Sequence, residues 1–421
     1  MNNLPSTTPA STNDRRSGRA ASFDPEARIG IIGAGPAGLT VARALTKRGF
    51  RRVTVLERES RVGGKCSSFM LDGRTYELGA VVLTPRYRNV LALARELGIK
   101  TVANADRSFP GGSWRRSAFL PPLCVDLEAR SATLWPPVLR TEPLQSIAAS
   151  CLRLAMASFR LRDTKKPGLS GTPREMSLPF EEWMRESRIT GGARFVVDPV
   201  LTALGYGYTT EIPAAYVLKY LSVVLAAPFL EVLDGGYQGL WEAAARGLDV
   251  RLGVTVRSIK RGEQTVVETD AGDWTFDAIV LTSPLDEAMS LLDATADEAE
   301  LAAKVRYNDY RLVIASASGL PENRYALFPK HFEASTRGEL LMWQKRWHDS
   351  DVYTFCAYGR EGSAMDETVT RVRETVRRLG GTITNVHRAK QWRCFPHVSS
   401  EDMARGFFER MDDMQGARHT Y

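Results

Sequence analysis

Apolar residues near the start of the chain follow two different periods. Ile29 to Ile32 and Val53 to Leu56 are short apolar runs, the pattern of buried strands. Between them, Leu39, Ala42 and Leu45 recur at helical spacing and would share one face of a helix. This order predicts a strand, a helix and a second strand, the unit from which parallel sheets are built.

Glycines occupy the turn that follows the first predicted strand. Gly33, Gly35 and Gly38 have the spacing G-x-G-x-x-G. The first permits a tight bend, the second lets the backbone approach a pyrophosphate, and the third lets the helix pack closely on the strand. Glu57, at the end of the second strand, would accept hydrogen bonds from ribose hydroxyls. The pattern predicts a dinucleotide site but does not separate FAD from NAD, and a purely structural glycine turn is the alternative.

A second glycine-rich segment follows at Arg61 to Lys65 (RVGGK), and the segment Tyr76 to Ala80 (YELGA) comes after it. Together they resemble the second signature of flavoproteins of the amine oxidase superfamily. Gly63 and Gly64 would lay backbone amides against the phosphates and ribityl chain, with the flanking arginine and lysine as charged donors. An ordinary basic turn before a hairpin is the alternative. The resemblance implies FAD as the cofactor.

The resemblance also implies a fold class and a set of cofactor residues. The class is α/β: a Rossmann-like FAD-binding domain of the glutathione reductase and amine oxidase type, with an inserted α+β substrate domain. In the superfamily, a valine in the pattern Val256-x-x-Ile259 contacts the adenine through its backbone. The residues expected to bind the cofactor are Gly33, Gly35, Gly38, Glu57, Arg58, Arg61, Gly63, Gly64, Lys65, Gly79, Ala80 and Val256.

Composition narrows the class of protein. The 421 residues are 43% hydrophobic and 9% aromatic, which are globular values that allow more than one domain. Five scattered cysteines lack metal-ligand spacing, so a reducing, cytoplasmic compartment is expected and a zinc site is not. The net charge of +7 suits anionic partners, yet no basic run interleaved with aromatics indicates nucleic acid.

Shifts in composition predict the division of the chain. We expect residues 1–27 to be a disordered lead-in, 28–100 the first part of the FAD-binding domain, 101–233 a mainly helical substrate domain, 234–300 the second part of the FAD-binding domain, 301–394 a substrate-domain sheet and helix, and 395–421 a return to the FAD domain.

Several local patterns carry further expectations. Val250 to Ile259 alternates like one strand, and Ala214 to Leu233 has the apolar character of a buried helix pair that is too interrupted to span a bilayer. Asp366 is a candidate helix cap. Ser146 to Arg162 mixes apolar residues with arginines, so it is either an interfacial helix in transient contact with a membrane or an ordinary surface helix.

Two later segments resemble a narrower family. Asp198 to Val224 and Phe395 to Tyr421 look like the FAD-dependent polyunsaturated fatty acid isomerases of bacteria, a branch of the amine oxidase superfamily. The likeness covers most of the chain from Arg28 and is weakest over residues 110–180. It implies conversion of linoleate to a conjugated diene by hydride transfer to and from the flavin. Because the flavin carries the hydride, no catalytic side chain and no metal are expected.

The same resemblance implies residues for the substrate, a small lipophilic molecule with an anionic carboxylate. Arg107 would hold the carboxylate and Phe229 would plug the entrance, although a plain surface arginine is an equal alternative for Arg107. Tyr206 and Tyr208 would line the acyl tunnel, and ordinary core packing is the alternative for both.

One departure from the family affects the expected cofactor affinity. In the family, a helical segment facing the flavin follows the HTY sequence, whereas this sequence ends at Tyr421, so weakened FAD retention is expected. Two other functions stay open: an FAD-dependent oxidase or dehydrogenase of an amine or lipophilic metabolite, and a non-catalytic remnant that binds FAD weakly. The true substrate, the double-bond position of the product and the oligomeric state are not determined by the sequence.

Overall fold

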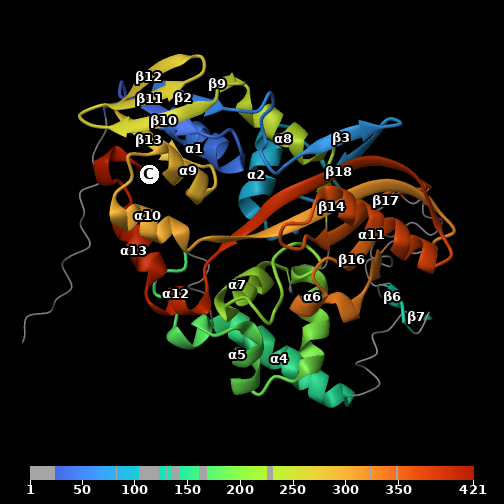
Figure 1. The fold of residues 1–421 in the computed structure, drawn as a ribbon. Coiled ribbons are helices and arrows are strands. Elements are labelled where there is room, and N and C mark those ends of the chain that lie inside the picture. The colour runs from blue at the N-terminus through green and yellow to red at the C-terminus, as the bar shows by residue number, and fades with distance from the viewer. Residues whose placement is uncertain are drawn as a thin grey trace, which may run out of the picture.

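A parallel sheet forms the centre of the nucleotide-binding half of the molecule (Figure 1). The computed structural model describes residues 24–81, 83–103, 123–128, 131–133, 142–160, 168–224, 231–321, 325–347 and 349–421. The strand order in this parallel sheet is β13 (Ala278–Leu281), β1 (Arg28–Ile32), β2 (Arg52–Glu57) and β9 (Asp249–Leu252). The predicted strand–helix–strand unit is therefore present, and strands from both expected parts of the nucleotide domain share one sheet.

Apolar side chains cover both faces of the parallel sheet. On one face, Leu39 of α1 (Pro36–Lys47) and Leu240 of α8 (Gly236–Ala245) pack against Ile31 and Val55, and all four are fully buried. On the other face lies a three-stranded antiparallel sheet of β10 (Val256–Arg261), β11 (Thr265–Thr269) and β12 (Gly272–Phe276). Burial on both faces explains the apolar runs of β1 and β13, whereas the edge strand β9 is mostly exposed.

The single strand expected over Val250 to Ile259 is wrong, because the structure contains two strands there. β9 ends at Leu252, and β10 begins in the other sheet at Val256. Gly253 makes the crossing with a backbone φ of +70°, and its N–H donates to the Glu59 carbonyl. Apolar and polar residues alternate across the break, with Val250, Leu252, Val254 and Val256 at every second position, so the pattern alone did not reveal the change of sheet.

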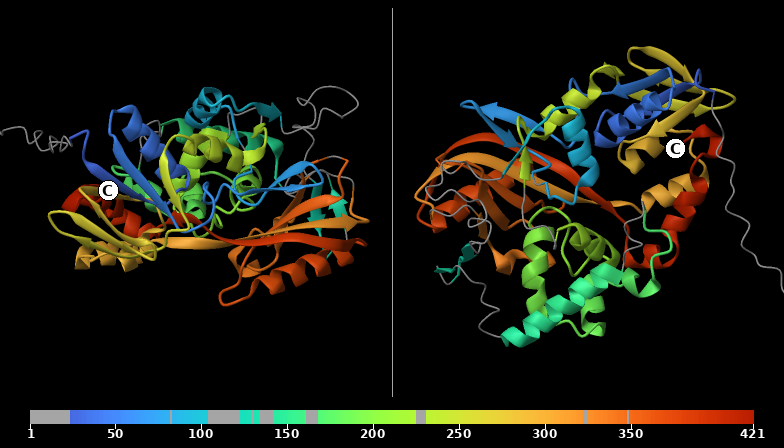
Figure 2. Two further views of the ribbon diagram at one scale, coloured as in Figure 1. Left: turned by 90° about the horizontal axis from the view of Figure 1, so that it is seen from above. Right: turned by 180° about the vertical axis from the view of Figure 1, so that it is seen from behind.

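A seven-stranded sheet, here called the large sheet, forms the other half of the molecule (Figures 1 and 2). Its order is β18 (Thr382–His397), β14 (Arg306–Ser318), β17 (Val352–Tyr358), β16 (Leu340–Lys345), β15 (Tyr325–Leu327), β6 (Leu123–Asp126) and β7 (Ser131–Thr133). Val372 and Val376 of α11 (Met365–Arg378) pack on one face. The predicted cap Asp366 is wrong: Ala364 holds the cap position, and Asp366 lies in the first turn.

Helices make up the region below the large sheet in Figure 1. They are α4 (Leu144–Arg160), α5 (Phe180–Glu186), α6 (Arg194–Leu201) and α7 (Ala214–Val224). The expected helix pair over Ala214 to Leu233 is wrong in its second half, where Glu231–Leu233 forms strand β8 against β5 (Thr101–Ala103). Pairing with β5 satisfies the backbone while Leu233 enters the core of the nucleotide-binding half.

The remaining elements connect the two halves. They are β3 (Ser68–Leu71), β4 (Arg74–Glu77), α2 (Arg88–Glu96), α9 (Leu285–Leu291), α10 (Ala296–Ala303), α12 (Ser400–Ala404), α13 (Phe407–Met414) and the short 3-10 turns Arg174–Ser177, Gly191–Ala193, Pro329–His331, Ala334–Thr336 and Ala417–His419. At the end of the chain, Tyr421 pairs through its backbone with Ile279 and Leu281 of β13, which returns the chain to the parallel sheet.

A buried carboxyl in α6 makes stability depend on pH. Asp198 is 6% exposed, accepts from Arg194 Nε at 3.2 Å and from the Thr209 hydroxyl at 3.0 Å, and burial raises its pKa from 3.8 to about 7. Between pH about 4 and about 7, Asp198 is therefore protonated in the folded state and ionised in the unfolded state. The free energy of unfolding should fall as pH rises through this range and level above it.

We expect Asp198→Asn to remove this decline. Above pH ~7 the free energy of unfolding of the variant should exceed that of the wild type by up to roughly 4 kcal/mol. Urea titrations from acid to neutral pH measure the difference. Asp413→Asn, which changes an exposed carboxyl of α13, is the control and should follow the wild type. Parallel curves for wild type and Asp198→Asn would refute a proton on Asp198.

Candidate functional site: a nucleotide cradle between two glycine segments

The first glycine turn has the geometry that the sequence predicted. Gly33 adopts a φ of +109° and donates its N–H to the Leu56 carbonyl at 2.8 Å, which ties the turn to the end of β2. A Cβ on Gly38 would overlap the Gly33 carbonyl oxygen, so only glycine lets α1 start this close to the strand. Thr282, which the sequence reasoning missed, donates its hydroxyl to the Ile32 and Gly33 carbonyls at 2.8 and 3.1 Å.

Space and hydrogen-bond donors at this turn fit the pyrophosphate of FAD. A Cβ on Gly35 would meet only the Cα of Gly64, at 4.0 Å, so the backbone there is open to close approach. α1 begins at Pro36 and no side chain caps it, which leaves first-turn N–H groups and the helix dipole directed at a ligand. This is the arrangement that helix N-termini use to bind phosphate.

Glu57 is held in place by backbone amides. Its side chain is nearly buried, and its two oxygens accept the N–H groups of Ala34 and Glu59 at 2.7 and 2.9 Å. Each carboxylate oxygen has a second acceptor site, so Glu57 can still receive hydroxyls of the adenosine ribose. Val256 packs beside Ile32 and Leu56 in the same corner, where the sequence predicted the adenine.

The second glycine segment lies against the first. Gly63 and Gly64 have φ values of +99° and +50°, and the Gly63 N–H donates to the Ala34 carbonyl at 2.9 Å. Arg61 folds back on its own loop and donates to the Val62 and Gly64 carbonyls at 3.1 and 2.9 Å. Its guanidinium therefore shapes the loop, and its remaining N–H groups are the ones left for a cofactor.

The segment that follows β4 completes the nucleotide cradle, the site formed by Gly33, Gly35, Gly63 and Gly64. A Cβ on Gly79 would overlap the Lys65 carbonyl oxygen, and the Ala80 N–H donates to that oxygen at 3.3 Å. Gly79 therefore permits the close approach that brings Ala80 against the second glycine segment. Lys65 itself is exposed, so its ammonium is accessible to a ligand.

Arg58 occupies a different environment from the other predicted cofactor residues. It is exposed and forms an ion pair with Glu287 of α9 at 3.1 Å, and Glu287 also pairs with Arg393 of β18 at 3.1 Å. These contacts link the nucleotide-binding half to the large sheet. A role of Arg58 at the cofactor stays a prediction.

Glu77 was not assigned a role from the sequence, although it lies within the YELGA segment. Its carboxylate is buried, accepts the Tyr237 N–H at 3.0 Å and the Ser68 hydroxyl at 2.5 Å, and lies 3.7 Å from Arg346. Burial raises the pKa of Glu77. The residue joins β4, α8 and the large sheet at one point beside the cradle.

A small pocket lies next to this junction. Its lining includes Glu77, Val81, Lys345 and Arg346, together with Tyr76, Tyr325, Gln344 and Thr354. Val81 directly follows Ala80, so the pocket borders the cradle. The lining contains two cationic side chains, Lys345 and Arg346, and one carboxylate, Glu77, so its cations outnumber its anions by one.

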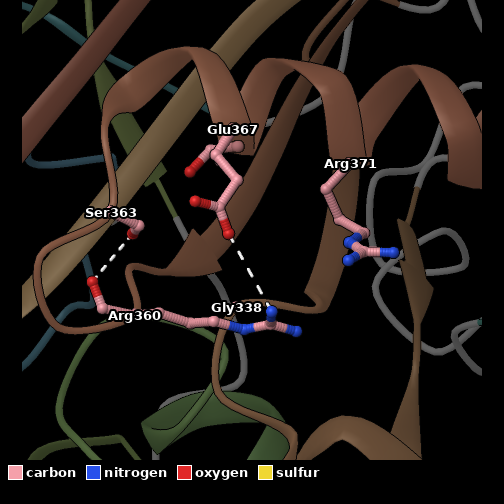
Figure 3. A pocket seen from close by; sticks show the side chains of 6 residues that line it. Gly338, Arg360, Ser363, Glu367 and Arg371 are labelled. Atoms are coloured by element: carbon pink, nitrogen blue, oxygen red, sulfur yellow. Dashed lines mark hydrogen bonds and ion pairs between the residues drawn. The ribbon is translucent and has the colours of Figure 1, made fainter.

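A second pocket, at the start of α11, has the same charge count in its lining, with Arg360 and Arg371 against Glu367 (Figure 3). Arg360 lies 3.9 Å from Glu367, and both Arg360 and Arg371 lie 3.5 Å from Glu339. Figure 1 places α11 on the large sheet, well apart from α1. The pocket is an ion-pair network and not part of the cradle.

The two predicted substrate tyrosines lie in separate aromatic clusters. The ring of Tyr206 lies 4.3 Å from that of Tyr220 and 5.3 Å from that of Phe395. Tyr208 instead packs 4.9 Å from Tyr358, in the core between the helices and the large sheet. The other two predicted substrate residues, Arg107 and Phe229, lie outside the described residues.

Two features are absent from the described residues. Among them, no group of three or more potential ligands is placed to hold a metal ion. No described helix combines the length and apolar character needed to cross a bilayer.

Comparison with known proteins identifies the family. The model for flavin containing amine oxidoreductases matches residues 36–406. Putrescine oxidase of Kocuria rosea is 45% identical over 76 residues, 18% of this chain and 16% of that protein. Coproporphyrinogen III oxidase of Mycobacterium bovis is 26% identical over 302 residues, 68% of this chain and 65% of that protein, so the chain spans less than two thirds of either relative.

Solved structures extend the likeness to the whole fold. The crystal structure of a CLA-producing fatty acid isomerase from P. acnes matches with a TM-score of 0.83 and 27% identity, covering 95% of this chain and 94% of that one. Cyclohexylamine oxidase from Brevibacterium oxydans matches with a TM-score of 0.66 at 15% identity, covering 91% and 90%, which shows a shared fold. The predicted α/β fold class and the suspected resemblance to the fatty acid isomerase branch are confirmed. The chain belongs to the flavin containing amine oxidoreductase family.

Proposed function

We propose that this protein is an FAD-dependent isomerase that moves a double bond of an unsaturated fatty acid. The observation that carries the proposal is the likeness to the fatty acid isomerase from P. acnes over 95% of the chain. The pocket beside Val81 adds support, because Lys345 and Arg346 outnumber the single carboxylate of Glu77. A surplus of positive charge favours a carboxylate substrate over the cationic substrate of an amine oxidase.

The reaction needs orientation and a dry site more than acid–base chemistry. FAD, when bound, can take a hydride from a carbon between two double bonds and return it at the far end of the conjugated system. The cradle around Gly35 and Gly64 would hold the dinucleotide. Tyr206, Tyr220 and Phe395 would border the acyl chain and exclude water, since their rings already pack together.

The anchor for the carboxylate belongs to the same proposal. Arg107 would hold the carboxylate through paired, charge-assisted hydrogen bonds, and Phe229 would close the entrance. Tyr208 packs against Tyr358 in the core, so its part would be to support the wall of the tunnel.

Anaerobic incubation of FAD-loaded protein with linoleate tests the proposal. We expect conjugated-diene absorbance to grow without any electron acceptor and the flavin to remain oxidised at the end of the reaction. Isomerisation conserves electrons, so hydrogen peroxide should not form when oxygen is admitted. Absence of diene in protein with full flavin occupancy would refute the proposal.

An oxidase is the second candidate, because the curated relatives are named as oxidases. Under the same anaerobic conditions an oxidase would bleach its flavin, recover its colour only with oxygen and release peroxide. Putrescine is the matched amine probe for that reaction.

A further inference from the structure

Helix α4 turns an apolar face away from the protein. The helix lies along the outer edge of the helical region (Figures 1 and 2). Leu144, Leu152 and Met156 are 69%, 62% and 49% exposed and follow one another at helical spacing. Ala148, at the intermediate position, is exposed as well. These residues form one continuous stripe, here called the outer stripe.

The inward face of α4 has the opposite character. Ile147, Ser150, Leu154 and Ser158 are buried there, so half of these positions are serines. Ser150 exchanges hydrogen bonds with Thr190 at 3.0 and 3.1 Å. A helix facing water normally buries its leucines and exposes its serines. α4 departs from this order at Leu152 and Met156, which are exposed, and at Ser150 and Ser158, which are buried. This indicates that its outer stripe meets an apolar medium.

Charge beside the outer stripe indicates which apolar medium. The seventeen residues of α4 contain Arg153 and Arg160 and no acid. Arg153 is exposed and donates to the carbonyl of Arg188, whose own side chain is also exposed. If a second copy of the chain packed on the stripe about a two-fold axis, the arginines of the two α4 helices would lie close together and repel, which disfavours a dimer there. An anionic lipid surface would accept both the apolar side chains and the cations.

We propose that α4 docks the protein on anionic lipid bilayers. Leu144, Leu152 and Met156 insert between lipid chains, and Arg153 contacts the headgroups. The purpose of docking rests on the proposed function, because a fatty acid substrate partitions into bilayers. The binding itself can be measured without any catalysis.

Flotation of the full chain with vesicles tests the proposal. We expect binding to vesicles of mixed phosphatidylcholine and phosphatidylserine, and weaker binding to phosphatidylcholine alone. Leu152→Glu with Met156→Glu should lower the partition coefficient at least about tenfold, since each change removes an inserted apolar side chain. Arg153→Gln should reduce the preference for phosphatidylserine and leave the weaker binding to phosphatidylcholine unchanged.

Leu252→Glu is the matched control, because Leu252 is 43% exposed on β9, in the other half of the molecule. It should bind vesicles like the wild type, and unchanged melting temperatures would show that all variants fold. Wild-type protein that ignores anionic vesicles would overturn the proposal. A Leu252→Glu variant that binds vesicles as poorly as the Leu152→Glu, Met156→Glu variant would also overturn it. So would a dimer in solution that dissociates when Leu152 and Met156 are changed. Failure to form conjugated diene would refute only the proposed function.

Discussion

Replacing Gly38 by alanine is expected to abolish flavin binding. The added methyl group would overlap the carbonyl oxygen of Gly33, which already accepts the hydroxyl of Thr282. Backbone cannot move aside as a flexible side chain can, so α1 would shift away from the end of β1. That shift would move the first-turn N–H groups from the pyrophosphate, and we expect FAD affinity to fall at least about hundredfold. Flavin absorbance per mole of purified protein measures the effect.

Gly239→Ala is the matched control, because it tests whether any glycine-to-alanine change near the cofactor site lowers flavin binding. Gly239 lies inside α8, and a Cβ there would have no atom within 4 Å. Alanine in a helix is favoured over glycine by roughly 0.5–1 kcal/mol, so this variant should retain flavin and be slightly more stable. A Gly38→Ala protein with normal flavin content would contradict the assignment of this turn to the cofactor.

Glu57→Ala should give the second large effect. The substitution removes the acceptor for the buried N–H group of Ala34, at about 1–3 kcal/mol, and for the part-buried N–H group of Glu59, at a smaller cost. It also removes the expected partner of the ribose hydroxyls. We expect the apoprotein to lose several kcal/mol of unfolding free energy and FAD to bind at least about hundredfold more weakly. Denaturant titration and a flavin fluorescence titration measure the two quantities.

Two further variants show which part of Glu57 matters. Glu59→Ala removes an exposed carboxylate two residues away and keeps the backbone N–H that Glu57 accepts, so both quantities should stay unchanged. Glu57→Gln keeps the length and one acceptor oxygen, so it should lie between alanine and the wild type. If Glu57→Ala weakened folding but left FAD affinity intact, Glu57 would be a support for the turn without a contact to the ribose.

The nucleotide-binding unit could be predicted because its determinants are contiguous. The apolar runs, the glycine spacing and Glu57 lie within about thirty residues, and each acts through local geometry. The turn at Gly33 and the helix from Pro36 follow from those residues wherever the rest of the chain goes. The second glycine segment was found in the same way, from a local signature.

Some residue patterns are compatible with two different secondary structures, and the neighbouring sequence alone could not decide between them. The alternation of Val250 to Ile259 suits one strand or two, and only pairing with β2 and β11 divides it. Apolar residues before Leu233 suit a helix, yet pairing with β5 makes Glu231–Leu233 a strand. The partners β2 of β9 and β5 of β8 are distant in sequence, so propensity had no information about them.

The sequence by itself determined a flavin nucleotide fold, the positions of its glycines and the acid at the end of β2. Only the tertiary structure decided that Glu77 meets Arg346 and that α4 exposes Leu152 while burying Ser150. The physical reason is range. A turn needs backbone freedom at a few neighbouring residues, whereas burial and ion pairing depend on which distant surfaces meet when the chain packs.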